Sequence, residues 1–181
     1  MLIINFKDLK KGRVLEFEKI YLQNEIDVPE NEVDIKDKKI KVNVKLEKRS
    51  NFILLTLNIS FVLKLICSRC LENFEKKYDL KEEFYLKKGE EILPKEKSLS
   101  NEDVYTIYYQ EEIIDITPLV RDTVILAKPL KPLCKEDCKG LCPICGVNWN
   151  YQKCEHFGKK METSFGLKLK EALKNYNKLR R

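Results

Sequence analysis

The sequence predicts an α+β fold in which a mainly antiparallel, bent sheet or partial barrel precedes a cysteine-rich segment and a C-terminal amphipathic helix. Up to about residue 110, hydrophobic residues recur with a period of two, which is typical of half-buried strands. A helical period appears only afterwards, following Thr117 and again following Thr163. Strands that come first and helices that come later form an α+β pattern.

The strands can be placed from the alternation. Apolar residues at 40, 42, 44 and 46 predict one strand, and residues 48–51 are expected to form a turn. The next run, 52–66, is long for one strand, so a bulge or bend is expected near its middle. The period resumes after residues 67–70, which places a Cys-x-x-Cys motif at the tip of a hairpin. A loop over 87–103 and a further strand over 104–109 are expected to follow.

Two helices are predicted. Thr117 and Pro118 are a typical helix start, because a hydroxyl can cap the helix and proline fits its first turn. The face expected to be buried contains Ile116, Val120, Val124 and Ala127. The last helix begins near Thr163, and its apolar arc contains Phe165, Leu169, Ala172, Leu173, Tyr176 and Leu179.

Composition describes a soluble globular protein. The chain has 181 residues, of which 43% are hydrophobic and 35% are charged. The longest uncharged stretch, 50–63, is too short to span a bilayer, and the first residues lack the pattern of a signal peptide. We therefore expect a cytoplasmic protein with no membrane partner.

The cysteines predict metal binding. There are seven cysteines and one histidine, and an odd number of cysteines cannot all be paired in disulfides. Eight candidate ligands would fill two closed tetrahedral zinc sites. The predicted ligands are Cys67, Cys70, Cys134, Cys138, Cys142, Cys145, Cys154 and His156. The expected cofactor is one or two structural zinc ions, which would order residues 131–158.

The spacing suggests how these ligands divide, without settling it. Cys142 and Cys145 flank a tight turn that ends in a glycine, and Cys154 with His156 could complete that tetrahedron. The pair Cys67/Cys70 needs two further ligands, and the pair 134/138 is left over. The alternatives are reduced cysteines without a metal, an iron–sulfur cluster, or redox chemistry at Cys67 and Cys70. A thioredoxin-type motif opens a helix, however, whereas a strand is expected here.

Positive charge is concentrated near the end of the chain. Residues 153–181 hold nine Lys or Arg and three Glu, beside aromatic residues at 149, 151 and 157. Basic patches with aromatic residues are suited to phosphate contact and base stacking. The candidate RNA-binding residues are Arg69, Trp149, Lys170, Lys174, Lys178 and Arg181. The alternative is that the basic face is only solvated and that Trp149 packs over the cysteine loop.

No catalytic pattern is present. The chain contains no P-loop, GxGxxG, GxSxG or HExxH motif, and its single histidine is a candidate metal ligand. Zinc ions closed by four protein ligands also lack the open position that catalysis requires. The sequence therefore favours a binding or assembly factor over an enzyme, with no small-molecule substrate.

Three motifs stand out: C-x-R-C-L at residues 67–71, the approach K-P-L-K-P-L-C at 128–134, and above all C-K-G-L-C-P-I-C-G-V-N-W-N over 138–150. They resemble the YceD family of large ribosomal RNA subunit accumulation proteins. Residues 3–9 and 165–169 resemble the family too. Family members commonly end the cysteine cluster with C-x-C, where this chain has Cys154-Glu-His156.

The resemblance implies a non-enzymatic role in the accumulation or processing of large-subunit (23S) rRNA, with zinc as structural support. The implied partners are this rRNA, a pre-ribosomal particle or a large-subunit ribosomal protein. Two other functions are considered: a thiol–disulfide or metal-handling protein that uses the CxxC pair, and a protein–protein adaptor for a ribosomal protein. Three parts are expected: a β-rich domain over 1–130, a zinc-binding segment over 131–158, and a basic helix over 159–181 that packs on the rest.

Overall fold

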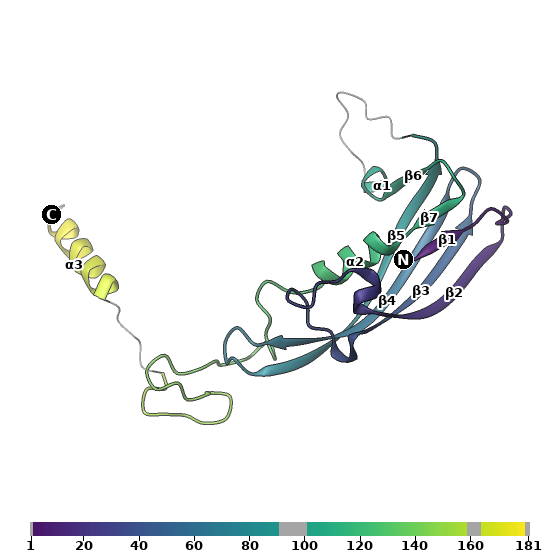
Figure 1. Cartoon of the computed structure of the whole chain (residues 1–181). Helices are drawn as coiled ribbons and strands as arrows, with labels where there is room; N and C mark the ends of the chain where they lie inside the picture. The colour runs from purple at the N-terminus through teal and green to yellow at the C-terminus, as the bar shows by residue number, and fades with distance from the viewer. Residues whose placement is uncertain (1, 91–100, 159–163, 180–181) are drawn as a thin grey trace. The chain divides into compact units, whose positions relative to one another are not determined.

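The computed structural model describes residues 2–90, 101–158 and 164–179 (Figure 1). The chain divides into two compact units, Met1–Glu136 and Asp137–Arg181. The first unit contains every strand that the structure describes, and the second contains the later cysteines and helix α3, Ser164–Leu179. The expected division at residues 130 and 158 stays a prediction.

A five-stranded sheet with the order β2-β3-β4-β5-β6 forms the body of the first unit. Its strands are β2 (Val14–Leu22), β3 (Lys39–Lys48), β4 (Ile53–Ile66), β5 (Asn73–Lys88) and β6 (Thr106–Tyr109). The first four are antiparallel, but β6 runs parallel to β5. The antiparallel prediction is therefore correct for most of a sheet that is in fact mixed. The sheet is not closed into a barrel, because β2 and β6 are its two edges in the described part of the chain.

Strands β4 and β5 form one long hairpin without a bulge. Their register is unbroken from the pair Ile53–Leu86 to the pair Ile66–Asn73. The predicted bulge is thus absent, and the length is accommodated by the twist of the two strands instead, as Figure 1 shows. Beyond Ser60, β3 no longer pairs with β4. In that part of the hairpin the rings of Phe61 and Tyr78, which are partners across the two strands, stack with their centroids 5.6 Å apart. As predicted, the CxxC motif lies at the hairpin tip.

The core lies on one face of this sheet. Alternate residues of β3 and β4 are buried, as their sequence period predicts: Ile40, Val42, Val44, Leu46, Ile53, Leu55, Leu57, Ile59, Phe61, Leu63 and Leu65. Helix α2, Thr117–Leu126, packs against the core through Ile116, Val120 and Val124. Burial of each such aliphatic side chain contributes about 1.5–3 kcal/mol.

The start of α2 differs from the prediction. The N-cap residue is Ile116, and Thr117 does not cap the helix with its hydroxyl. That hydroxyl instead accepts a hydrogen bond from the Leu2 N–H at 2.7 Å and donates one to Asp115 Oδ1. It thereby holds a second, two-stranded sheet of β1 (Ile3–Asn5) and β7 (Ile113–Asp115) next to the helix.

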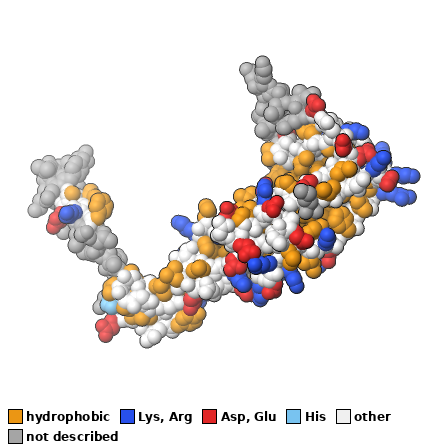
Figure 2. Space-filling model, in the orientation of Figure 1, with side chains coloured by type: hydrophobic (Ala, Val, Ile, Leu, Met, Phe, Trp, Pro, Cys, Tyr) orange, Lys and Arg blue, Asp and Glu red, His pale blue; other side chains and the backbone are white. Residues whose placement is uncertain are grey.

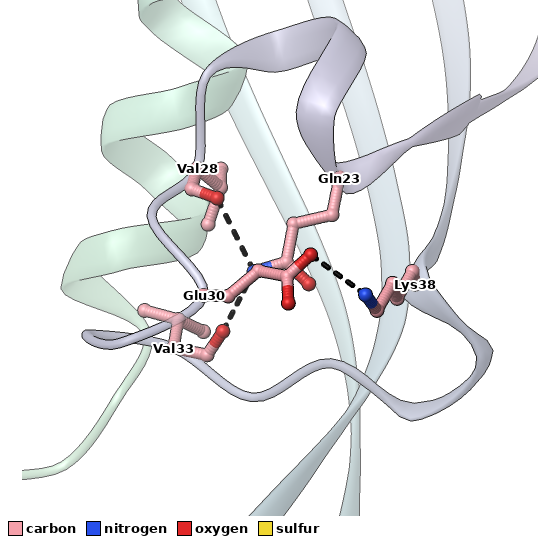
Figure 3. A network of polar contacts seen from close by, with 5 residues as sticks. All are labelled: Gln23, Val28, Glu30, Val33 and Lys38. Carbon is pink, nitrogen blue, oxygen red and sulfur yellow. Dashed lines mark hydrogen bonds and ion pairs between the residues drawn. The ribbon is translucent and has the colours of Figure 1, made fainter.

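Residues 27–35 connect the short helix η1, Gln23–Ile26, to the short helix η2, Lys36–Lys38, with little regular structure. A buried side chain organises this segment (Figure 3). Gln23 Nε2 donates to the carbonyls of Val28 at 3.2 Å and Val33 at 2.7 Å, and Gln23 is only 1% exposed. These bonds satisfy backbone acceptors that no strand partner reaches.

The elements that follow β5 agree only in part with the prediction. The strand expected over 104–109 begins only at Thr106, because Val104 ends the short helix α1, Asn101–Val104. Most of the expected loop over 87–103 lies outside the described residues. Helix α3 is present where the helical period predicts it, but its docking on the rest of the protein stays a prediction. Its apolar residues Phe165, Leu169 and Leu173 are 74%, 50% and 54% exposed.

The surface of the sheet-bearing unit carries both signs of charge side by side (Figure 2). Ion pairs on the outer face of the sheet include Lys41–Glu18, Lys77–Asp79 and Lys81–Glu83, at 2.7–2.9 Å. Among the described residues, no helix is both long and apolar enough to cross a membrane.

Candidate metal centre

The first CxxC motif forms a tight turn between β4 and β5. The Cys67 N–H donates to Glu72 O at 2.9 Å, and the Leu71 N–H donates to Cys67 O at 2.9 Å. Leu71 takes a left-handed backbone conformation with φ 60°. The turn is also tied to a later segment, because the Ser68 N–H donates to Pro132 O at 2.8 Å. This bond brings the residues before Cys134 to the hairpin tip.

The second CxxC motif has the same backbone pattern. The Cys142 N–H donates to Val147 O at 2.8 Å, and the Gly146 N–H donates to Cys142 O at 2.9 Å. Gly146 has φ 74°, which corresponds to the conformation of Leu71 in the first turn. Such turns direct both sulfur atoms and several N–H groups to one side, an arrangement suited to binding a metal ion through thiolates.

The eight predicted ligands gather as two groups of four. Group 1 is Cys67, Cys70, Cys134 and Cys138, and group 2 is Cys142, Cys145, Cys154 and His156. Within each group the candidate ligand atoms all lie within 4.8 Å of one another. Both groups could hold a metal ion, and they correspond to the division that the spacing suggested.

The distances suit tetrahedral zinc. A Zn–S bond of about 2.3 Å places the sulfur atoms of a tetrahedron about 3.8 Å apart. In group 1, Cys70 Sγ and Cys134 Sγ are 3.6 Å apart, and in group 2 Cys142 Sγ lies 3.8 Å from His156 Nδ1. Thiolate and imidazole donors in fours are the usual ligands of structural zinc. The residues present therefore fit this ion.

Two thiols, Cys67 and Cys154, have lowered pKa values. Burial raises the pKa of Cys67, but N–H groups of Cys134, Cys70 and Arg69 outweigh it and lower the pKa to about 6. The indole N–H of Trp149 donates to Cys154 Sγ at 3.3 Å and lowers the pKa of that thiol to about 6. A metal ion binds the thiolate form, so these hydrogen bonds favour the charge state that a metal requires.

Cys145 behaves differently. The Val147 N–H acts to lower its pKa, but the neighbouring thiols Cys142 and Cys154 oppose it, and the pKa is raised. Sulfur atoms this close cannot all carry a negative charge at neutral pH unless a cation lies among them. The opposite shifts within group 2 thus reflect the close approach of its thiols.

None of the seven cysteines, all of which lie in the described part of the chain, forms a disulfide. Cys67 is 0% exposed and Cys70 is 3% exposed, so neither sulfur is open to a substrate disulfide. The pair also lies between two strands, whereas redox CxxC motifs usually open a helix. The geometry therefore favours metal binding over thiol exchange at this turn.

The candidate RNA-binding residues are not brought together as one site. Arg69 is exposed at the hairpin tip and donates to Glu136 O at 3.5 Å, and Lys170 is exposed on α3. Trp149 is half-buried and lies edge-on to Phe157 at 5.4 Å, so it packs over the cysteine loop. Arg181 and the side chains of Lys174 and Lys178 lie outside the part that the structure describes.

Sequence reasoning missed Asn150. Its Nδ2 donates to Cys138 Sγ at 3.3 Å and to Asn148 Oδ1 at 2.9 Å, while its Oδ1 accepts from the Lys139 N–H at 2.9 Å. An asparagine between two cysteine motifs carries no spacing signal of its own, because these bonds depend on how the loop folds. Only its place in the run of 138–150 could have drawn attention to it.

The fold and these two groups define a class: an α+β protein with two cysteine-rich sites that could each hold a metal ion. The model of the YceD family, described as large ribosomal RNA subunit accumulation protein YceD, matches residues 55–173. This chain belongs to the YceD family. The matched range contains both CxxC turns and most of α3, while the resemblance noted at residues 3–9 lies outside it.

Two kinds of curated relatives are similar to shorter segments. Uncharacterized proteins of Mycobacterium bovis and Mycobacterium tuberculosis are 49% identical over 37 residues, which is 20% of this chain and 18% of each relative. The chloroplastic large ribosomal RNA subunit accumulation protein YCED homolog 1 of Arabidopsis thaliana is 33% identical over 70 residues, 34% of this chain and 22% of the relative. The chain thus spans about a fifth of the length of these relatives. No solved structure matches it.

Proposed function

We propose that this protein is a cytoplasmic ribosome-biogenesis factor that supports the accumulation or processing of large-subunit (23S) rRNA by binding, without catalysis. Family membership supports the role in rRNA accumulation. The observation that carries the rest is the pair of four-ligand groups at two matching turns. Four protein ligands close a zinc site and leave no position for a substrate, so zinc would act as a structural element.

The cellular test is depletion of the protein followed by measurement of the ratio of 23S to 16S rRNA. The proposal expects this ratio to fall and to recover when the wild-type chain is supplied. A variant with Cys142 and Cys145 both changed to serine is expected to restore it poorly. An unchanged rRNA ratio on depletion would overturn the role in accumulation.

Two structural zinc ions are proposed, one at each group. The ions would neutralise thiolates that repel one another and would order residues 137–158, which contain few buried apolar side chains. Metal analysis of protein purified in a reducing buffer is expected to give two zinc ions per chain. One zinc or none would contradict the assignment, and iron in its place would indicate a cluster.

The proposed RNA contacts are Arg69, Trp149 and the basic residues of α3 and its end: Lys170, Lys174, Lys178 and Arg181. The motivating observation is the positive charge of residues 153–181. Reversal of Lys170, Lys174 and Lys178 to glutamate is expected to reduce co-sedimentation with rRNA or pre-ribosomal particles while the melting temperature stays unchanged. A matched control reverses three exposed lysines of the first unit: Lys7, Lys10 and Lys11.

The outcomes of this experiment separate RNA binding from an adaptor role. Equal loss in the control would show that only net charge matters, and unchanged binding in the α3 variant would remove that helix from the RNA surface. Association with a large-subunit ribosomal protein that survives nuclease treatment would identify the adaptor instead. These results leave the metal assignment unaffected, since it rests on a separate measurement.

A further inference from the structure

Two consecutive side chains, Trp149 and Asn150, donate hydrogen bonds to the two different cysteine groups. Trp149 Nε1 donates to Cys154 Sγ of group 2 at 3.3 Å. Asn150 Nδ2 donates to Cys138 Sγ of group 1, also at 3.3 Å. The residue that donates to a sulfur atom of group 2 is therefore directly followed in the sequence by the residue that donates to a sulfur atom of group 1.

The backbone around this dipeptide is fixed on both sides. The Trp149 N–H donates to Gly140 O at 2.9 Å, and residues 141 and 148 form a short antiparallel bridge. The Asn150 N–H and Nδ2 both donate to Asn148 Oδ1, at 3.0 and 2.9 Å. Neither side chain can be displaced without disturbing the strand-like segment that leads into Cys142.

The amide of Asn150 has no freedom to serve another partner. Its two N–H groups are used by Cys138 Sγ and Asn148 Oδ1, and its oxygen accepts from the Lys139 N–H. Cys138 is only 2% exposed, so water cannot easily replace the amide as a donor to that sulfur. A hydrogen bond to a buried thiolate disperses its charge and favours the metal-bound form.

We infer that Trp149 and Asn150 are positioning residues that couple the two metal sites, so that an ion at group 2 strengthens ion binding at group 1. This inference rests on the proposed metal binding. An ion at group 2 would order residues 142–156 and with them the dipeptide. Asn150 would then hold Cys138 as a ready ligand for the second ion. Because coupling of two binding equilibria is reciprocal, an ion at group 1 would strengthen group 2 equally.

The test is a double-mutant cycle on the full chain, with Co²⁺ and Zn²⁺ as probes. The absorption of thiolate-bound Co²⁺ distinguishes a four-sulfur site from a site with three sulfurs and one imidazole, and a chromogenic chelator gives the zinc affinities. Group 2 is removed by C142S with C145S, and the coupling residue by N150A. A control, Gln152→Ala, removes an exposed amide from the same loop.

Each single change is expected to weaken zinc binding at group 1 by about 10- to 100-fold, the usual effect of losing a partner of a metal ligand. In the N150A background, removal of group 2 should add little further loss, because the coupling is already broken. The Gln152→Ala control should leave both sites unchanged.

If the decrease in group 1 zinc affinity in the combined variant equals the product of the two single decreases, the changes act independently. That result would overturn the coupling and leave the metal assignment intact. Unchanged group 1 affinity in N150A would overturn it as well. Absence of metal from both groups in the wild-type chain would instead remove the metal assignment itself, so the two failures are distinguishable. Circular dichroism of each metal-free variant checks that the sheet of the first unit still forms.

Discussion

Leu71 occupies, in the first CxxC turn, the position that Gly146 occupies in the second. Both residues have positive φ, 60° and 74°, and both donate their N–H to the carbonyl of the first cysteine of their turn. Glycine adopts this conformation freely, whereas a side chain costs about 1–2 kcal/mol there. The leucine side chain is also 65% exposed. The first turn therefore retains a strained apolar residue at its surface.

Exchange of these residue types tests the strain. Gly146→Ala is expected to lower the free energy of unfolding by about 1 kcal/mol. The cost would come from the backbone alone, because nothing lies within 4 Å of the added Cβ. Leu71→Gly should change stability by less than about 0.5 kcal/mol, since relief of strain offsets the greater freedom of the unfolded chain. Urea unfolding measures both, and a large loss in Leu71→Gly would show that the side chain itself is stabilising.

Gln23→Ala is expected to destabilise the first unit by about 2–3 kcal/mol. The change leaves the carbonyls of Val28 and Val33 without their buried donor, which is more costly than the net value of one hydrogen bond. The midpoint of urea unfolding should fall accordingly. Asn24→Ala, at the exposed neighbouring position, is the matched control and should have little effect. Equal stability of both variants would contradict the role assigned to Gln23.

The contribution of the Asp115 carboxylate to stability is expected to depend on pH. Burial acts to raise its pKa, but hydrogen bonds from the Thr117 hydroxyl and N–H outweigh it and hold the pKa below the ordinary value of 3.8. Because the folded pKa is the lower one, its stabilisation is complete above the unfolded pKa and is lost as the pH falls through the folded pKa.

Asp115→Asn should therefore lower the free energy of unfolding at pH 7 by less than about 1 kcal/mol, because water screens the charge of this exposed carboxylate. The difference from the wild type should begin to shrink as the pH falls below about 4 and vanish only below the lowered pKa of the folded protein. Urea unfolding over a pH series measures this difference, with Asp122→Asn as an exposed control. A difference that stays constant down to pH 2 would show that the charge of Asp115 is not responsible.

Thiol alkylation reports the opposite pKa shifts within group 2. In metal-free protein at pH 7, iodoacetamide should modify Cys154, with a pKa of about 6, faster than Cys145, whose pKa is raised. Trp149→Phe should slow the reaction of Cys154 because it removes the indole N–H. Peptide mass spectrometry follows each site, and added zinc should protect both. Faster modification of Cys145 would contradict the assignment.

The sequence predicted the central strands well because one buried face forces a period of two on β3 and β4. It could not predict that β6 runs parallel to β5, since alternation carries no strand direction. The pairing of β1 with β7 was also missed, because three-residue strands are too short to show a period and lie far apart along the chain. Local helix rules likewise suggested a capping role for Thr117, which its contacts with Leu2 and Asp115 replaced.

At the candidate metal centre, the candidate ligands could be named from the sequence, but the residues that donate hydrogen bonds to their sulfur atoms could not. Cysteine and histidine are recognisable by type and spacing, and a count of eight already suggested two sets of four. The bonds from Trp149 and Asn150 depend on the folded loop, so residue type alone does not reveal them. The packing partner of the basic helix could not be predicted either, because an amphipathic pattern shows which face of a helix is apolar but not what packs against it.

The unbroken register of β4 and β5 has a consequence for how this chain can change in evolution. Side chains alternate between the two faces along the hairpin, which is about 45 Å long for the fourteen residues of β4. One extra residue in either strand would turn every side chain beyond it to the opposite face. Natural length variants of this arm should therefore gain or lose residues in even numbers on both strands, which would carry the cysteine turn nearer or farther without rotating it.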